Sequence, residues 1–164
     1  MILASPKWPI TSSSSWQIVT DKKYMDVSRA EIMRELSTSG TYDVEYEHTT
    51  VDDFENKVTV VLRVNISCKH PEYPEGWTFA LKLHNTRIDG FDHEEKFQAT
   101  DGTIQSGWHR HIWNAKSKSA EKDKAPVLDL DGVVSREEFV IRTLNLTHTT
   151  VSATDYGQDI LPFA

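Results

Sequence analysis

The chain has 164 residues and a net charge of -7, and 38% of its residues are hydrophobic and 26% charged. These values are typical of a folded chain of ordinary size, so we expect residues 1–164 to form a single globular domain. The acidic balance argues against a general DNA-binding protein, because such proteins draw their affinity from lysine and arginine side chains at phosphates. Binding to RNA or to a protein partner stays open.

Nothing in the sequence points to a membrane or to export. No apolar run approaches the roughly 20 residues that cross a bilayer, and the first residues lack the pattern of a signal peptide. The single cysteine, Cys68, cannot form an internal disulfide. We therefore expect a cytoplasmic protein without membrane contact.

The N-terminal part of the chain predicts an irregular segment, a short strand and a helix. Residues 1–15 contain two prolines and a serine run, which favour irregular chain, and residues 16–20 are expected to form a strand. Ser28 and Glu31 have the spacing of a capping box at a helix start, and Gly40 is suited to end that helix.

From residue 42 onward, apolar and polar side chains alternate. The alternation over residues 42–49, 57–68 and 77–89 is typical of neighbouring strands in an antiparallel meander, and "GWHRHIWN" at 107–114 adds a further strand. A second helix is expected at 135–146 from another capping-box spacing, although its β-branched residues also suit a strand. The predicted fold class is α+β: a curved, mainly antiparallel sheet with about two helices on one face.

Five polar side chains are expected to form a site at the end of this sheet. If the strand at 77–89 stays regular, Arg87 and Asp89 extend its apolar face. A long connection that carries His93 would then lead to the strand bearing His109 and His111. These two histidines share a strand face about 7 Å apart at Cα, so both imidazoles can act on one bound group.

Two kinds of chemistry fit this set. One histidine can accept a proton while the other donates one, with Arg87 stabilising charge on a phosphate, which suits metal-independent cleavage of a phosphodiester. Alternatively, the histidine pair and a third ligand would bind a divalent metal such as zinc, leaving a position for water. The candidates for this third ligand are His93, Asp89 and Asp92.

A third interpretation involves no chemistry at all. Trp108 and Ile112 would form the buried side of the strand, and both histidines would face water. The lysine-rich segment 114–126 is likewise interpreted as a solvated loop, because acidic residues and serines separate its lysines.

The order "RID", a histidine, "DG" and "GWHRHIW" resembles the core pattern of TumE-like toxins of prokaryotic toxin-antitoxin modules. The resemblance covers residues 77–114. It implies an RNA-cleaving activity and a protein partner such as an antitoxin. The site residues that it implies are Arg87, Asp89, His93, His109 and His111.

Two hypotheses of function follow from these patterns. The first is a nuclease-like toxin or conflict-system protein that acts on RNA through the histidine pair and Arg87. The second is a non-enzymatic acidic protein of phage or mobile-element origin that docks on a basic partner or mimics nucleic acid. The acidic segment 42–55 would carry that docking surface on an outer strand and turn, through Glu45, Glu47, Asp52 and Asp53.

Overall fold

The computed structural model describes residues 8–121 and 123–152, and they form an α+β fold. Three α-helices lie in this part of the chain: α1 (Ser12–Thr20), α2 (Arg29–Ser39) and α3 (Arg136–Leu146), with a short 3-10 helix at Leu128–Leu130. The strands are β1 (Lys23–Ser28), β2 (Thr41–Val51), β3 (Lys57–Ser67), β4 (Thr78–Leu83), β5 (Thr86–Gln98), β6 (Ile104–Ile112), β7 (Ala125–Pro126) and β8 (Thr149–Ser152).

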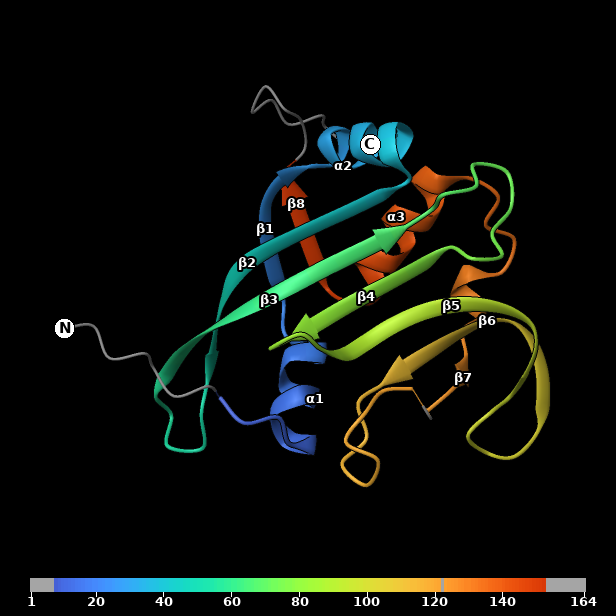
Figure 1. The fold of residues 1–164 in the computed structure, drawn as a ribbon. Coiled ribbons are helices and arrows are strands. Elements are labelled where there is room, and N and C mark those ends of the chain that lie inside the picture. The colour runs from blue at the N-terminus through green and yellow to red at the C-terminus, as the bar shows by residue number, and fades with distance from the viewer. Residues whose placement is uncertain (1–7, 122, 153–164) are drawn as a thin grey trace.

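The main sheet is an antiparallel meander of six strands in the order β2-β3-β4-β5-β6-β7. Each strand therefore pairs with its neighbour in sequence, as the alternating segments predict (Figure 1). The strands β1 and β8 form a separate, parallel pair beside it.

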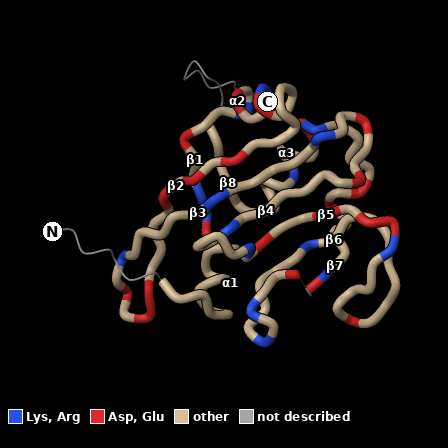
Figure 2. The backbone as a smooth tube through the Cα atoms, viewed as in Figure 1, with Lys and Arg blue, Asp and Glu red and all other residues tan. Residues whose placement is uncertain are grey.

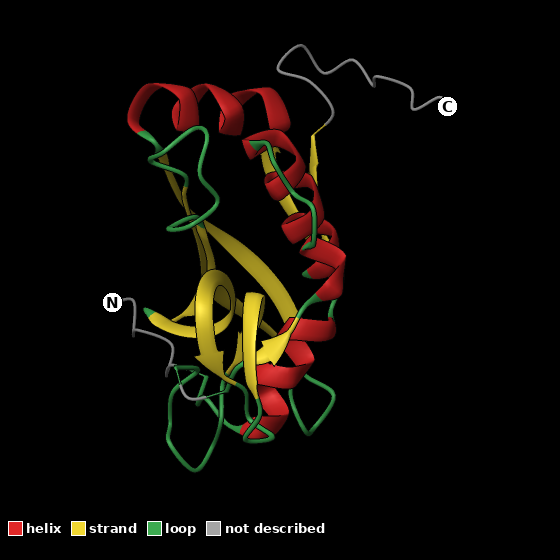
Figure 3. Cartoon of the chain, turned by 90° about the vertical axis from the view of Figure 1, so that its right-hand side faces the viewer, coloured by secondary structure: helices red, strands yellow, loops and turns green. Residues whose placement is uncertain are grey.

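Helices α1 and α3 lie on one side of the main sheet, so about two helices cover one face, as expected. Figure 3 shows α3 and α1 following one another along that side, with α2 across its upper end. The apolar sides of β3 and β4 face the helices and form the core, with Leu62, Phe79 and Leu81 fully buried. The opposite side of the sheet, called the open face below, carries none of the helices of the described residues.

The prediction for residues 12–20 is wrong, because they form helix α1 instead of irregular chain followed by a strand. Thr11 caps this helix: its hydroxyl accepts from the Ser14 amide, and the Ser14 hydroxyl accepts from the Thr11 amide. Ile18 and Val19 are then buried on the inner side of the helix. The fold thus has one helix more than the expected two.

Both predicted helices are confirmed, together with their starts. Ser28 accepts from the Glu31 amide at α2, and Ser135 accepts from the Glu138 amide at α3. Gly40 ends α2 in the left-handed conformation, with a φ of 77°.

The segment 77–89 forms two strands and not the single strand expected. His84 and Asn85 have φ values of 52° and 63°, so they make the tight turn with two left-handed residues that joins hairpin strands. Arg87 and Asp89 therefore lie on β5. Asp92 and His93 lie on the same strand, so the predicted long connection is wrong.

No helix among the described residues is long and apolar enough to cross a membrane. The predicted irregular segment 1–15 falls partly, at residues 1–7, outside the described residues. Residues 153–164 of the C-terminal stretch also lie outside the described residues. Strand β8 belongs to the part of that stretch that the structure describes.

Candidate functional site

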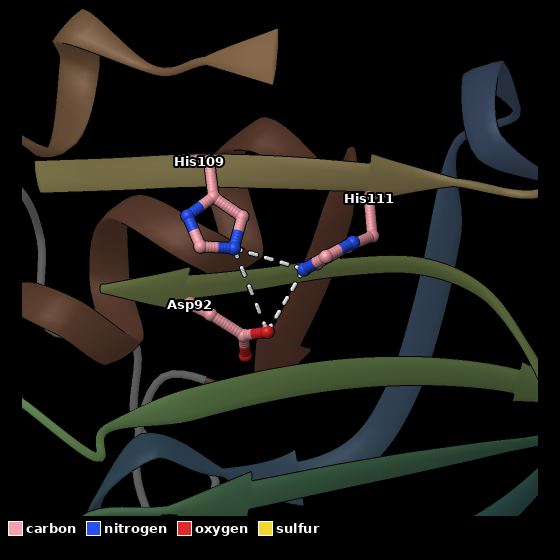
Figure 4. Close-up of side chains that lie close together, drawn as sticks. All are labelled: Asp92, His109 and His111. Carbon is pink, nitrogen blue, oxygen red and sulfur yellow. Dashed lines mark hydrogen bonds and ion pairs between the residues drawn. The ribbon is translucent and has the colours of Figure 1, made fainter. Parts of the chain in front are cut away.

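Three side chains from β5 and β6 point at one another on the open face. Asp92 pairs in register with His109, and Gly90 pairs with His111. The two histidine Nε2 atoms are 2.9 Å apart, and the Asp92 Oδ2 atom is 2.9 Å from the Nε2 of His111 and 3.8 Å from that of His109 (Figure 4). We call these three residues the His-Asp cluster.

Asp89 does not belong to this cluster, contrary to the expectation. It pairs with Leu81 on the helix side of the sheet and is fully buried there. Its carboxylate accepts from the Nε and Nη2 atoms of Arg110, at 2.8 and 2.6 Å. Arg110 also donates to the carbonyl of Leu146 at the end of α3, so this ion pair joins the hairpin to that helix.

Arg87 and Asp89 are two residues apart yet face opposite sides, because a β-bulge separates them. Arg87 pairs with Lys82 and Asp89 pairs with Leu81, so β5 holds one extra residue, Ile88, between the two pairs. Alternation alone would have kept both polar side chains on one face.

His93 is also on the helix side of the sheet. Its ring packs edge-on against Trp108, with the ring centroids 5.0 Å apart, and its Nδ1 atom is 4.0 Å from the Glu75 carboxylate. It therefore takes no part in the His-Asp cluster.

The interpretation in which the histidines face water is wrong. His109 is fully buried and His111 is 2% exposed, while Trp108 on the other face is also buried. The loop of residues 114–121, 123 and 124, called the covering loop below, lies over the pair: the Nδ1–H of His111 donates to the Ala120 carbonyl at 3.0 Å. Of the segment 114–126, which was expected to be a solvated loop, these residues form a loop that closes over the site, and Ala125–Pro126 form strand β7 beside β6.

The hydrogen bond to Ala120 fixes the form of the His111 ring. A carbonyl only accepts, so Nδ1 carries a hydrogen, and in the neutral ring Nε2 has a free lone pair. This lone pair points toward a carboxylate oxygen of Asp92 and toward Nε2 of His109. The Asp92 oxygen and this lone pair are both acceptors, so their approach to 2.9 Å is unfavourable unless a proton or a metal cation lies between them.

The charges of the cluster follow from its surroundings. Burial, and after it the neighbouring His111, lowers the pKa of His109 to about 4, so this ring is neutral at pH 7. Burial raises the pKa of Asp92, but the charge of Arg87 and the contact with His111 Nε2, when that nitrogen carries a proton, outweigh it, and the pKa lies below its usual value. The site therefore offers a neutral imidazole and a carboxylate, which are metal-binding forms.

The geometry of the cluster fits a divalent metal ion. Ligand atoms about 2.0–2.1 Å from a tetrahedral zinc ion lie about 3.3 Å from one another, and the separations here are 2.9, 2.9 and 3.8 Å. The Ala120 carbonyl orients His111 as an outer partner commonly orients a metal-bound histidine. Asp92 Oδ1 is buried and has no hydrogen-bond partner among the described residues.

Arg87 lies beside the cluster, as the sequence predicts. Its Nη1 atom is 3.5 Å from Asp92 Oδ2, and its Nη2 atom is 2.7 Å from the Glu121 carboxylate in the covering loop. Gly90 makes room for this arginine, because a Cβ atom there would meet Arg87 Cδ at 2.9 Å and the Phe79 carbonyl oxygen at 2.8 Å.

An open groove of about 480 Å³ runs along the sheet next to Arg87 and Asp92. Its lining is mostly polar and includes the small residue Ala80. The side chains around it come from β3, β4, the following turn, β5 and the covering loop, and include Asn65, Thr78, Lys82, Asn85 and Glu121.

The acidic segment lies where the sequence predicts, on an outer strand and its turn. Glu45 and Glu47 are exposed on β2, an edge strand of the sheet, and Asp52 and Asp53 are in the turn toward β3. Two of these carboxylates interact with neighbouring groups of the protein. Glu45 is 3.7 Å from Arg63, and Asp52 accepts hydrogen bonds within its own turn, from the amides of residues 54 and 56.

A scan against protein-family models finds no matching family, and searches of curated proteins and of solved structures find no match either.

The sequence patterns do not single out Glu94 or Lys124 as site residues. Glu94 lies 3.3 Å from the Nε2 of His109 and 3.0 Å from the ammonium of Lys124, which joins the covering loop to β5. Asp92 was considered only as one of several possible metal ligands. The alternation of Asp92 and Glu94 on one strand would have been the signal, once β5 was known to continue past residue 89.

Proposed function

We propose that the His-Asp cluster binds a divalent metal ion such as zinc, and that the protein is a metal-dependent hydrolase acting on RNA. The observation that supports the metal is the convergence of Asp92 Oδ2 and the two histidine Nε2 atoms, which lie within 3.8 Å of one another. The resemblance to TumE-like toxins supports RNA as the substrate and an antitoxin as a protein partner.

A metal site accounts for the geometry better than acid-base catalysis by the two histidines. Acid-base cleavage needs each imidazole to reach a different substrate atom. Both rings instead direct Nε2 at one point, and both are buried below the covering loop. Their shared neighbour at that point is Asp92, a carboxylate and therefore a natural third ligand.

The residues around the cluster would have different roles in hydrolysis. A bound metal ion would supply Lewis acidity and a water of lowered pKa. Arg87 would neutralise charge on the scissile phosphate, since its guanidinium is at the edge of the open groove. Glu94 would accept the proton that the attacking water loses, because its carboxylate is 3.3 Å from His109 and remains partly exposed.

The second hypothesis, a docking protein with an acidic surface, has weaker support. Glu45 already interacts with Arg63, and the carboxylate of Asp52 is occupied by its own turn. The proposal keeps the cytoplasmic location, which suits the lone, buried and free Cys68.

The test is cleavage of a fluorescently labelled single-stranded RNA by the zinc-loaded protein. We expect a double variant, His109→Ala with His111→Ala, to lose about 100-fold or more of the activity, because it loses the metal. His93→Ala is the matched control on the other face of the same hairpin and should keep it. Cleavage that survives both the double variant and a chelator would contradict the proposal.

A further inference from the structure

We infer that the open groove beside the His-Asp cluster binds a phosphate group, that Lys82 and Arg87 are its cationic contacts, and that the Glu121 carboxylate occupies this position until phosphate displaces it. This inference deepens the proposed function. It rests on that proposal for the contact between a bound phosphate and the metal ion.

Three basic side chains form a row across the open face. Arg63 on β3 pairs in register with Lys82 on β4, and Lys82 pairs with Arg87 on β5. Figure 2 shows basic positions on these neighbouring strands. Like charges directly opposite each other destabilise a sheet, so the row is unfavourable for the fold by itself.

The two arginines of the row form ion pairs, whereas the charge of Lys82 acts on Asp43 only from a longer distance, where it helps to lower the pKa of that carboxyl. Arg63 is 2.6 Å from Asp43, and Arg87 is 2.7 Å from Glu121. The ammonium group of Lys82 makes no hydrogen bond and no ion pair with any residue that the structure describes. A cation between two other cations, on the wall of a groove, is a suitable contact for an anionic ligand.

Two further polar side chains of the groove suit a phosphate ligand. Asn65 and Thr78 line it with neutral hydrogen-bond donors, beside the cations of Lys82 and Arg87. A guanidinium also matches the geometry of phosphate oxygens and can bind two of them at once. A volume of about 480 Å³ leaves space for more than the phosphate itself.

Glu121 marks the position of the anion. Its carboxylate is 2.7 Å from Arg87 Nη2, although its own side chain is 68% exposed. Ion pairs at such exposed positions contribute little to stability, about 0–1 kcal/mol. A phosphate carries more charge than this carboxylate and can contact Lys82 at the same time, so it can replace Glu121 on the arginine.

The experiment is isothermal titration of the full-length protein with inorganic phosphate and with adenosine 5′-monophosphate, with and without zinc. We expect Lys82→Gln to weaken binding of both ligands about 10-fold or more, the scale of one hydrogen bond to a charged group. Glu121→Gln should tighten binding about 3-fold, because it frees Arg87. Lys57→Gln, on the same face of β3 but outside the groove, should bind as the wild type does.

The two variants are expected to change the affinity for phosphate in opposite directions, which makes the inference falsifiable. Unchanged binding in Lys82→Gln, or weaker binding in Glu121→Gln, would overturn it. Tighter binding of the nucleotide than of inorganic phosphate would support a nucleotide phosphate as the natural ligand, and equal binding would support phosphate alone. Phosphate binding that persists without zinc and depends on Lys82 would uphold the groove even if the metal proposal fails.

Discussion

Two aspartates three residues apart on β5 show how position decides the role of a side chain. Asp92 is on the open face, close to two histidine nitrogens, and is partly exposed. Asp89 is on the helix side, where Arg110 holds both of its oxygens. Burial raises the pKa of Asp89, and the pairing with Arg110 opposes that rise. We therefore interpret Asp92 as a functional residue and Asp89 as a structural one.

The variant Asp89→Ala tests this distinction. It should lower the free energy of unfolding by about 3–5 kcal/mol, because Arg110 would keep a partly buried charge without its partner. Zinc binding by the folded variant should match that of the wild type. Urea denaturation at pH 7 measures the stability, and Asp26→Ala, at an exposed aspartate of β1, is the matched control with an expected change of about 0.5 kcal/mol or less. Loss of zinc binding from the folded Asp89→Ala protein would contradict the structural role.

At the scale of elements, the side chain of Lys23 connects strand β1 to the end of helix α1 by hydrogen bonds. Its side chain is 2% exposed, and its ammonium donates to the carbonyls of Ile18 at 2.5 Å and Asp21 at 2.8 Å, at the C-terminal end of α1. A cation at this end of a helix is favourable, but burial lowers the pKa of Lys23 to about 8. Near neutral pH the fold thus keeps a buried charge whose desolvation costs stability.

This buried lysine predicts a pH dependence of stability. Above pH 8 the folded protein releases the Lys23 proton, while the unfolded chain retains it until about pH 10.4. The unfolded state then binds more protons, so the contribution of Lys23 to stability rises with pH. The unfolding free energy of the wild type relative to Lys23→Met should increase by about 2 kcal/mol from pH 7.5 to 9.5. A difference that stays constant over this range, measured by urea denaturation, would contradict the buried charge.

The sequence predicts most of the elements where capping and alternation are strong. Ser28 and Ser135 mark the starts of α2 and α3, and alternation marks β2 and β3. Helix α1 was missed because its cap lies next to a serine run that also suits irregular chain. The turn at His84 and Asn85 was missed because left-handed residues are usually signalled by glycine, which is absent there.

At the scale of the whole molecule, the sheet separates two environments. Its helix side holds the apolar core and the buried Asp89–Arg110 pair. Its open face holds the His-Asp cluster, the groove and the covering loop. The histidine pair could be predicted from its spacing on one strand. The placement of Arg87 and Asp89 on opposite faces of the sheet could not be predicted, because it depends on a bulge that breaks the alternation.

The loop that covers the site is a further feature that sequence could not predict. The sequence of this loop indicates only a polar, lysine-rich connection, and the contacts of Ala120, Glu121 and Lys124 depend on distant partners. Ala120 accepts from His111, Glu121 reaches Arg87, and Lys124 reaches Glu94. Such contacts arise only when the fold brings β5, β6 and the loop together.

The most direct test of the central claim is the metal content of the purified, untagged protein by inductively coupled plasma mass spectrometry. After incubation with zinc and removal of the excess, we predict about one zinc ion per chain, as expected for one ligand set. His93→Ala should retain it, and the double variant His109→Ala with His111→Ala should lose it. A wild-type protein that retains no metal, or a double variant that retains as much as the wild type, would contradict the claim.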